Sequence, residues 1–79
     1  MKKIVIKLME WGVSFQYENH NSNGEEINCH DISLEIKTYQ GQLFFEFEGD
    51  KEELEETEMN FTYICDMIEK IMIAETSSF

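Results

Sequence analysis

Residues 32–47, ISLEIKTYQGQLFFEF, decide the fold of this 79-residue chain. Apolar and polar residues alternate on both sides of Gln40-Gly41, which is typical of strands with one buried face. Glycine at the second turn position suits a two-residue hairpin loop, because that position needs positive φ. The resulting register predicts the pairs Thr38–Leu43, Ile36–Phe45 and Leu34–Phe47, and a buried face made of Ile32, Leu34, Ile36, Phe45 and Phe47.

The same register places Glu35 directly opposite Glu46 on the outer face of the hairpin. Like charges opposite each other destabilise a sheet by up to about 1 kcal/mol. A sequence under selection for stability alone would avoid this pair. One interpretation is that the outer face is negative for a reason outside folding; chance is the other.

An earlier hairpin is expected around Trp11-Gly12, because residues 4–8 and 13–17 also alternate. It would pair Leu8 with Phe15 and Ile6 with Tyr17. Residues 19–28, rich in Asn and Ser, are typical of a surface loop.

From Asp50 the period becomes helical. Asp50 and Glu53 resemble a capping box, and acidic residues in a first turn suit the helix dipole. A break near Thr57 would give two shorter helices, and residues 76–79 are expected to fray. The apolar stripe predicted to lie on the sheet comprises Leu54, Phe61, Ile64, Cys65, Ile68, Ile71 and Met72.

Together these elements predict one α+β domain over residues 1–79. Two β-hairpins form a four-stranded antiparallel sheet, and the C-terminal helix covers one of its faces, giving the order ββββα.

Negative charge is the main surface property of the chain, which has a net charge of −11. Such a protein repels nucleic acid and anionic membranes and attracts basic protein surfaces. A solvated helix face with capping acids is the alternative explanation. Eight of the 17 acidic residues lie between positions 46 and 58: Glu46, Glu48, Asp50, Glu52, Glu53, Glu55, Glu56 and Glu58.

Met59, Tyr63 and Met67 recur at a spacing of four residues on the helix face opposite the apolar stripe. Methionine adapts to a partner surface and tyrosine is a frequent anchor, so this second stripe indicates a protein contact. A homodimer covering the stripe and isolated, tolerated apolar residues are the alternatives.

No pattern in the chain encodes a reaction. The segment from Asn19 lacks the terminal glutamate of a calcium loop, and Cys29-His30 lacks paired zinc-ligand spacing. The carboxylates are expected on solvated surfaces, where nothing would raise a pKa toward neutrality. We therefore expect no enzyme activity, no cofactor and no metal.

A cytoplasmic location is expected. The chain has no secretory signal and no apolar run of about 18 residues that could span a membrane. Its two cysteines are too few for a disulfide scaffold and are expected to be reduced.

In size, acidity and predicted sheet-plus-helix form, the chain resembles small phage-encoded inhibitors of bacterial defence, notably anti-CRISPR proteins and other DNA mimics. The resemblance is one of character, covers no motif and transfers no residue. It implies that carboxylates occupy a groove in which lysine and arginine normally hold phosphates, within a nucleic-acid-binding effector complex in the host cytoplasm.

The residues expected to bind this basic partner are Glu35, Glu46, Glu48, Glu52, Glu53, Glu55, Glu56, Glu58, Met59, Tyr63 and Met67. An immunity protein or antitoxin that neutralises a basic toxin needs the same complementarity. A homodimeric structural or regulatory module without a charged partner is the third hypothesis.

Overall fold

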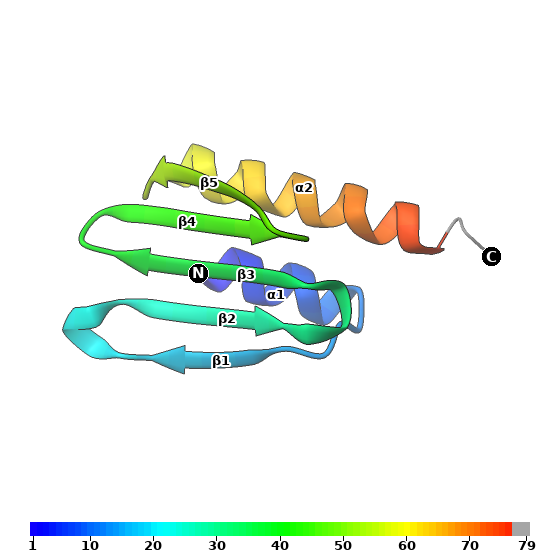
Figure 1. The fold of residues 1–79 in the computed structure, drawn as a ribbon, viewed down its shortest axis with the longest axis horizontal. Helices are drawn as coiled ribbons and strands as arrows, with labels where there is room; N and C mark the ends of the chain where they lie inside the picture. Colours follow the sequence, from blue (N-terminus) through cyan, green and yellow to red (C-terminus); the bar gives the residue numbers. More distant parts are fainter. Residues whose placement is uncertain (77–79) are drawn as a thin grey trace.

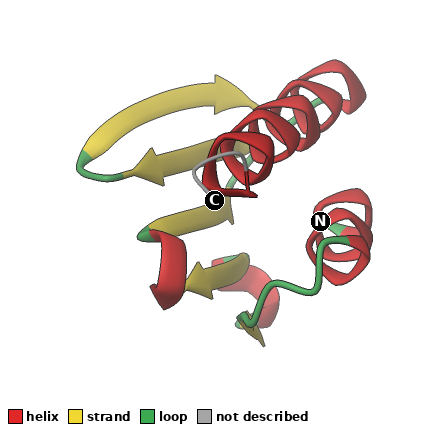
Figure 2. Ribbon diagram, turned by 90° about the vertical axis from the view of Figure 1, so that its right-hand side faces the viewer, coloured by secondary structure: helices red, strands yellow, loops and turns green. Residues whose placement is uncertain are grey.

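A five-stranded antiparallel sheet with two helices on one face makes up the computed structural model, which describes residues 1–76 (Figures 1 and 2). The strands follow one another in the order β1-β2-β3-β4-β5, so every connection joins neighbours. The two α-helices and five strands are α1 (Lys2–Glu10), β1 (Gln16–Asn19), β2 (Glu25–Cys29), β3 (Leu34–Tyr39), β4 (Gln42–Phe47), β5 (Asp50–Glu55) and α2 (Glu58–Thr76). Two short 3₁₀ helices, η1 (Asn21–Asn23) and η2 (His30–Ile32), precede and follow β2.

The β3–β4 hairpin confirms the predicted register. Ile36 pairs with Phe45 and Glu35 with Glu46, around a turn in which Gln40 and Gly41 have φ values of 48° and 79°. Positive φ at both turn residues is the two-residue geometry that matches strand twist. Of its inward residues, Leu34, Ile36, Thr38, Leu43 and Phe45 are buried. Phe47 and Ile32, also predicted for the buried face, are only partly buried beside the core, and Ile32 lies in η2 rather than in the strand.

The predicted N-terminal hairpin is wrong, because residues 2–10 form helix α1. Their apolar residues fit two periods at once. The strand period groups Ile4, Ile6 and Leu8, whereas the helical spacing groups Ile4, Val5 and Leu8 on one side. Packing on the sheet selects the helix, which buries Ile4 and Leu8 and leaves Ile6 46% exposed.

The expected loop over residues 19–28 contains most of strand β2. One predicted strand became α1, and two strands that were not predicted, β2 and β5, joined the sheet, so it has five strands rather than four. Tyr17 pairs with Ile27 instead of Ile6. The strand was hidden because its outward positions are polar, while only Ile27 and Cys29 supply buried apolar side chains.

Residues 50–55 form strand β5 and not the start of a helix. Glu48 and Gly49 have φ values of 50° and 90°, so the chain turns back after β4 and pairs Phe47 with Asp50. Helix α2 begins at Glu58, where the Thr57 hydroxyl accepts a hydrogen bond from the Asn60 amide at 3.2 Å. The suspected break near Thr57 is thus the junction of strand and helix.

The core lies between the sheet and the two helices. The predicted apolar stripe is confirmed on α2 from Phe61 to Met72, where Ile64, Cys65, Ile68 and Ile71 are buried; it is wrong for Leu54, which lies on a strand. Phe61 and Met72 pack beside them, and Leu54 contributes from β5. The expected frayed tail lies outside the described residues, apart from Thr76, which ends α2.

Candidate functional site

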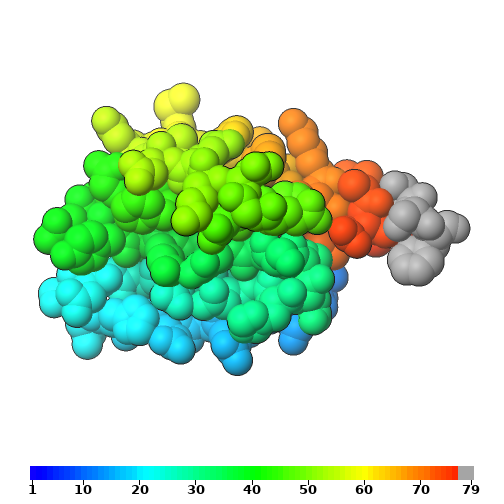
Figure 3. All heavy atoms as spheres, viewed as in Figure 1, coloured from blue at the N-terminus to red at the C-terminus, as the bar shows by residue number. Residues whose placement is uncertain are grey.

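Both helices cover the same face of the sheet, so the opposite face is uncovered (Figures 1 and 2). We call this uncovered surface the open face; it is the one turned toward the viewer in Figure 3. Side chains alternate along strands, and paired residues share a face. The register therefore places three rows on the open face: Glu18, Glu26, Lys37, Phe44 and Glu53; then Gln16, Asn28, Glu35, Glu46 and Lys51; then Tyr39, Gln42 and Glu55.

The open face is strongly acidic, with six carboxylates and two lysines in these rows. Lys37 lies 3.0 Å from Glu35 and 3.8 Å from Glu26, and Lys51 lies 3.9 Å from Glu46. The hydrogen bond and charge of Glu35 raise the pKa of Lys37. Within residues 1–76, Glu53 and Glu55 form no ion pair.

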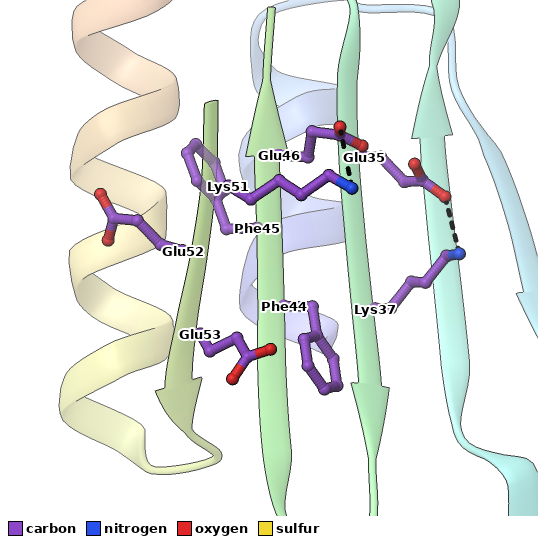
Figure 4. Close-up of a pocket in the computed structure, with 8 residues that line it drawn as sticks. All are labelled: Glu35, Lys37, Phe44, Phe45, Glu46, Lys51, Glu52 and Glu53. Carbon is purple, nitrogen blue, oxygen red and sulfur yellow. Dashed lines mark ion pairs between the residues drawn. The ribbon is translucent and has the colours of Figure 1, made fainter. Parts of the chain in front are cut away.

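Phe44 is a half-buried aromatic residue in the middle of this charged surface. Its neighbours across the strands are Lys37 on β3 and Glu53 on β5. Figure 4 shows Phe44 between these two side chains, with Lys51 extending across β4 toward Glu46. The shallow hollow around it has a volume of about 260 Å³. Its charged lining consists of four carboxylates and two lysines: Glu35, Glu46, Glu52, Glu53, Lys37 and Lys51.

An aromatic ring within a set of carboxylates suits a cationic side chain. A guanidinium group can stack on the ring and hydrogen-bond to a carboxylate at the same time. Phe44 therefore gives the open face a specific anchor point in addition to its charge.

The eleven residues expected from the sequence do not form one continuous surface. Four of the carboxylates lie on the open face: Glu35, Glu46, Glu53 and Glu55. The others lie elsewhere: Glu48 is in the β4–β5 turn, Glu52 faces the helix side, Glu56 follows β5, and Glu58 begins α2.

The stripe of Met59, Tyr63 and Met67 is not uniformly exposed. Met59 is 84% exposed, whereas Met67 packs partly against the core. The Tyr63 hydroxyl donates hydrogen bonds to Glu52 at 3.1 and 3.2 Å, which raise the pKa of Tyr63. These contacts join α2 to the edge of the sheet and give two members of the stripe a structural role.

Strand β5 offers a structural reason for part of the acidic run. It is an edge strand, and five of its six residues are charged. Edge strands with unpaired backbone groups are protected from unwanted pairing by charged side chains. Glu52 and Glu55 can act in this way whatever the protein binds.

The cysteines do not have the properties of a reactive site. Both are free and buried, and burial raises the pKa of the Cys29 thiol to about 11. A thiol with so high a pKa is a poor nucleophile at neutral pH. Across residues 1–76, no three His, Cys, Asp or Glu side chains are grouped to hold a metal ion.

The sequence did not lead us to Phe44, Glu26 and the two lysines of the open face, because only carboxylates were considered on the sheet and apolar contact residues only on the helix. The hairpin register contained a signal for Phe44, because it places Leu43 and Phe45 inward and Phe44 outward. Glu26 carried no such signal, because its strand was not recognised.

Comparisons with protein-family models, curated proteins and solved structures found no match for this chain. No helix within residues 1–76 is both long and apolar enough to cross a membrane.

Proposed function

We propose that this chain is a small acidic inhibitor that binds a basic protein surface through the open face of its sheet. The bound surface would be the nucleic-acid-binding groove of a host defence complex, as for phage anti-CRISPR proteins and other DNA mimics. The observation that carries the proposal is the Phe44 hollow, where an aromatic ring lies among carboxylates that outnumber the two lysines, on an uncovered sheet.

The proposed contact uses two kinds of residue. Phe44 receives an arginine side chain of the partner, and Glu46 or Glu53 accepts its hydrogen bonds. Glu53 and Glu55 have no lysine partner within residues 1–76, so binding a basic surface breaks no ion pair of theirs.

Charge repulsion supports a binding role for the open face. Glu35 and Glu46 remain opposite each other although the pair costs stability. A single substitution would remove either charge if the sequence were selected only for stability. Residues that lower the stability of the fold are common in binding surfaces, where they serve the function.

The inhibitor acts without catalysis and in the cytoplasm of the host cell. Two free, buried cysteines are compatible with a reducing compartment. Inhibition follows from occupancy alone, because carboxylates that fill a phosphate-binding groove exclude the nucleic acid.

Affinity capture from a bacterial lysate at low and high salt tests this proposal. We expect a nucleic-acid-binding protein to be retained at low salt and released by high salt or by excess duplex DNA. The test variant carries Glu46→Gln, Glu53→Gln and Glu55→Gln, and we expect it to lose the captured protein.

A matched control separates the location of the charge from its amount. Glu48→Gln, Asp50→Asn and Glu56→Gln remove the same charge away from the open face, so binding should persist. Equal losses in both variants, or binding that salt does not weaken, would refute the proposed mimicry. Capture of a basic toxin without nucleic-acid competition would favour an immunity protein.

A further inference from the structure

An apolar groove lies at the opposite side of the molecule from β5, between α1 and the edge strand β1. It has a volume of about 570 Å³. Its apolar lining comes from Met1, Val5, Ile6, Phe15 and Tyr17, of which Ile6 and Tyr17 are 46% and 44% exposed. One lysine, Lys2, and one glutamate, Glu25, complete the lining, so the groove is balanced in charge.

The free edge of β1 borders this groove and presents unpaired backbone groups. The His20 amide donates to the Gly24 carbonyl at 2.8 Å, which makes these two residues a hydrogen-bonded pair. Hydrogen-bonded and non-hydrogen-bonded pairs alternate along antiparallel strands. The N–H and C=O groups of Tyr17 and Asn19 therefore point away from β2, toward solvent.

The two edges of the sheet differ in how they are protected. Strand β5 has five charged residues among six, whereas β1 has only Glu18 among four. Charge on an edge strand discourages pairing with another chain, and β1 largely lacks this protection. A second copy of this chain can therefore approach β1 but not β5.

The acidic run at β5 does not oppose contact at this edge. Four strand spacings separate β1 from β5, about 19 Å at about 4.8 Å each. This distance exceeds twice the Debye length of about 8 Å at physiological salt. Repulsion from the acidic run at β5 is therefore largely screened where two β1 edges meet.

We propose that two copies of this chain associate through their β1 edges around a twofold axis. An antiparallel edge pairs with itself under twofold symmetry. In this arrangement Tyr17 pairs with Tyr17 of the partner subunit. The backbone N–H and C=O groups that point away from β2 form hydrogen bonds between the two strands, and the apolar side chains of both strands stay on the helix side of the sheet. The two grooves then adjoin across the axis and cover each other's apolar residues.

The association extends the sheet and leaves both open faces uncovered. It is thus compatible with the proposed function and independent of it. The two differ in their response to salt, because the dimer depends on apolar contact and backbone pairing, whereas the acidic face depends on charge.

Measurement of molar mass against concentration tests the association with the full chain. We expect the mass to rise toward twice 9.4 kDa between about micromolar and millimolar protein and to persist in high salt. A mass of one chain throughout this range overturns the proposal.

Two matched variants locate the interface. Ile6→Lys should raise the dissociation constant by at least about tenfold, because it buries a charge in the groove. It also lowers the net negative charge, so a loss of dimer cannot be ascribed to repulsion. Met59→Lys makes the same charge change on α2 and should leave the dimer intact; dissociation by Met59→Lys and not by Ile6→Lys overturns the proposal.

Amide hydrogen exchange in the unmodified protein identifies the strand edge. Exchange at Tyr17 and Asn19 should slow as the dimer forms. The backbone amides of Glu53 and Glu55 on β5, which point away from β4, should keep the same exchange rate at all protein concentrations. Slowing at β5 without slowing at Tyr17 contradicts β1 pairing.

Discussion

Glu35 on β3 and Glu46 on β4 lie directly opposite each other on the open face of the sheet, and each carboxylate is near its own lysine. Lys37 is 3.0 Å from Glu35, while Lys51, a more exposed side chain, is 3.9 Å from Glu46. The lysines reduce the repulsion between the two carboxylates without removing it.

Glu46→Gln should therefore stabilise the fold. The change removes the repulsion from Glu35, worth up to about 1 kcal/mol, and gives up only a weak, exposed ion pair. Urea unfolding should show a higher midpoint for the variant. Glu35→Gln is the control: it gives up the closer contact with Lys37, so its gain should be smaller. A lower midpoint for Glu46→Gln would contradict this explanation.

Phe44 and Phe45 are neighbours on β4 that face opposite sides of the sheet. Phe45→Ala empties a core position and should cost about 3–5 kcal/mol, a large part of the stability of a domain this size. Phe44→Ala should cost much less, because Phe44 is half-buried on the open face. Thermal unfolding compares the two variants. Equal losses would mean that Phe44 belongs to the core and would remove it as a binding residue.

Gly24 connects η1 to β2 where no side chain fits. A Cβ atom at this position would be 1.7 Å from the Thr38 carbonyl oxygen, and φ is +89°. Gly24→Ala should therefore cost more than the roughly 1–3 kcal/mol of positive φ alone. Gly49 has nearly the same φ, +90°, but open space around it. Gly49→Ala thus measures the backbone strain by itself, and chemical denaturation should rank it clearly above Gly24→Ala in stability.

The Lys3 ammonium and the Glu58 carboxylate, 2.7 Å apart, join α1 to the start of α2. Lys3 lowers the pKa of Glu58 from its ordinary value of 4.5, and Glu58 raises the pKa of Lys3. The carboxyl pKa is lowered on folding, so the stabilisation is present above the ordinary value and is lost as pH falls through the lowered pKa. At the alkaline end it is lost as pH rises through the raised pKa of Lys3.

Glu58→Gln should accordingly unfold at a slightly lower urea concentration at neutral pH, and the difference from the unmodified chain should vanish in acid. Unfolding curves at neutral and strongly acidic pH measure this. Glu48→Gln, which removes a carboxylate without a lysine partner among residues 1–76, should show no such loss. A difference for Glu58→Gln that persists in acid would rule out the ion pair as its cause.

The sequence predicted those parts of the fold in which local chemistry and packing agree. At Gln40-Gly41, turn preference and alternation of apolar residues both favour one hairpin, and its register is correct. The apolar spacing of α2 from Phe61 to Met72 likewise has only one regular solution, a helix. The facing carboxylates Glu35 and Glu46 followed directly from the hairpin register.

The remaining elements depended on contacts that the sequence does not reveal. Residues 2–10 satisfy both a strand and a helix period, and only packing decides between them. Residues 50–55 have the composition of a helix start, yet pairing with β4 makes them a strand. The Glu48-Gly49 turn resembles Gln40-Gly41 and was the signal for the turn between β4 and β5. Without β5, the acidic run could not be divided between the open face and the helix side.

Nuclear magnetic resonance of the isotopically labelled protein, titrated with an arginine-rich peptide, tests the open face most directly. We expect the largest shifts at Phe44, Glu46 and Glu53 on the open face, and we expect them to shrink as salt is added or when Phe44 is replaced by alanine. Larger shifts at Met59 and Tyr63 on α2, or equal shifts at acidic residues all over the molecule, would contradict this expectation.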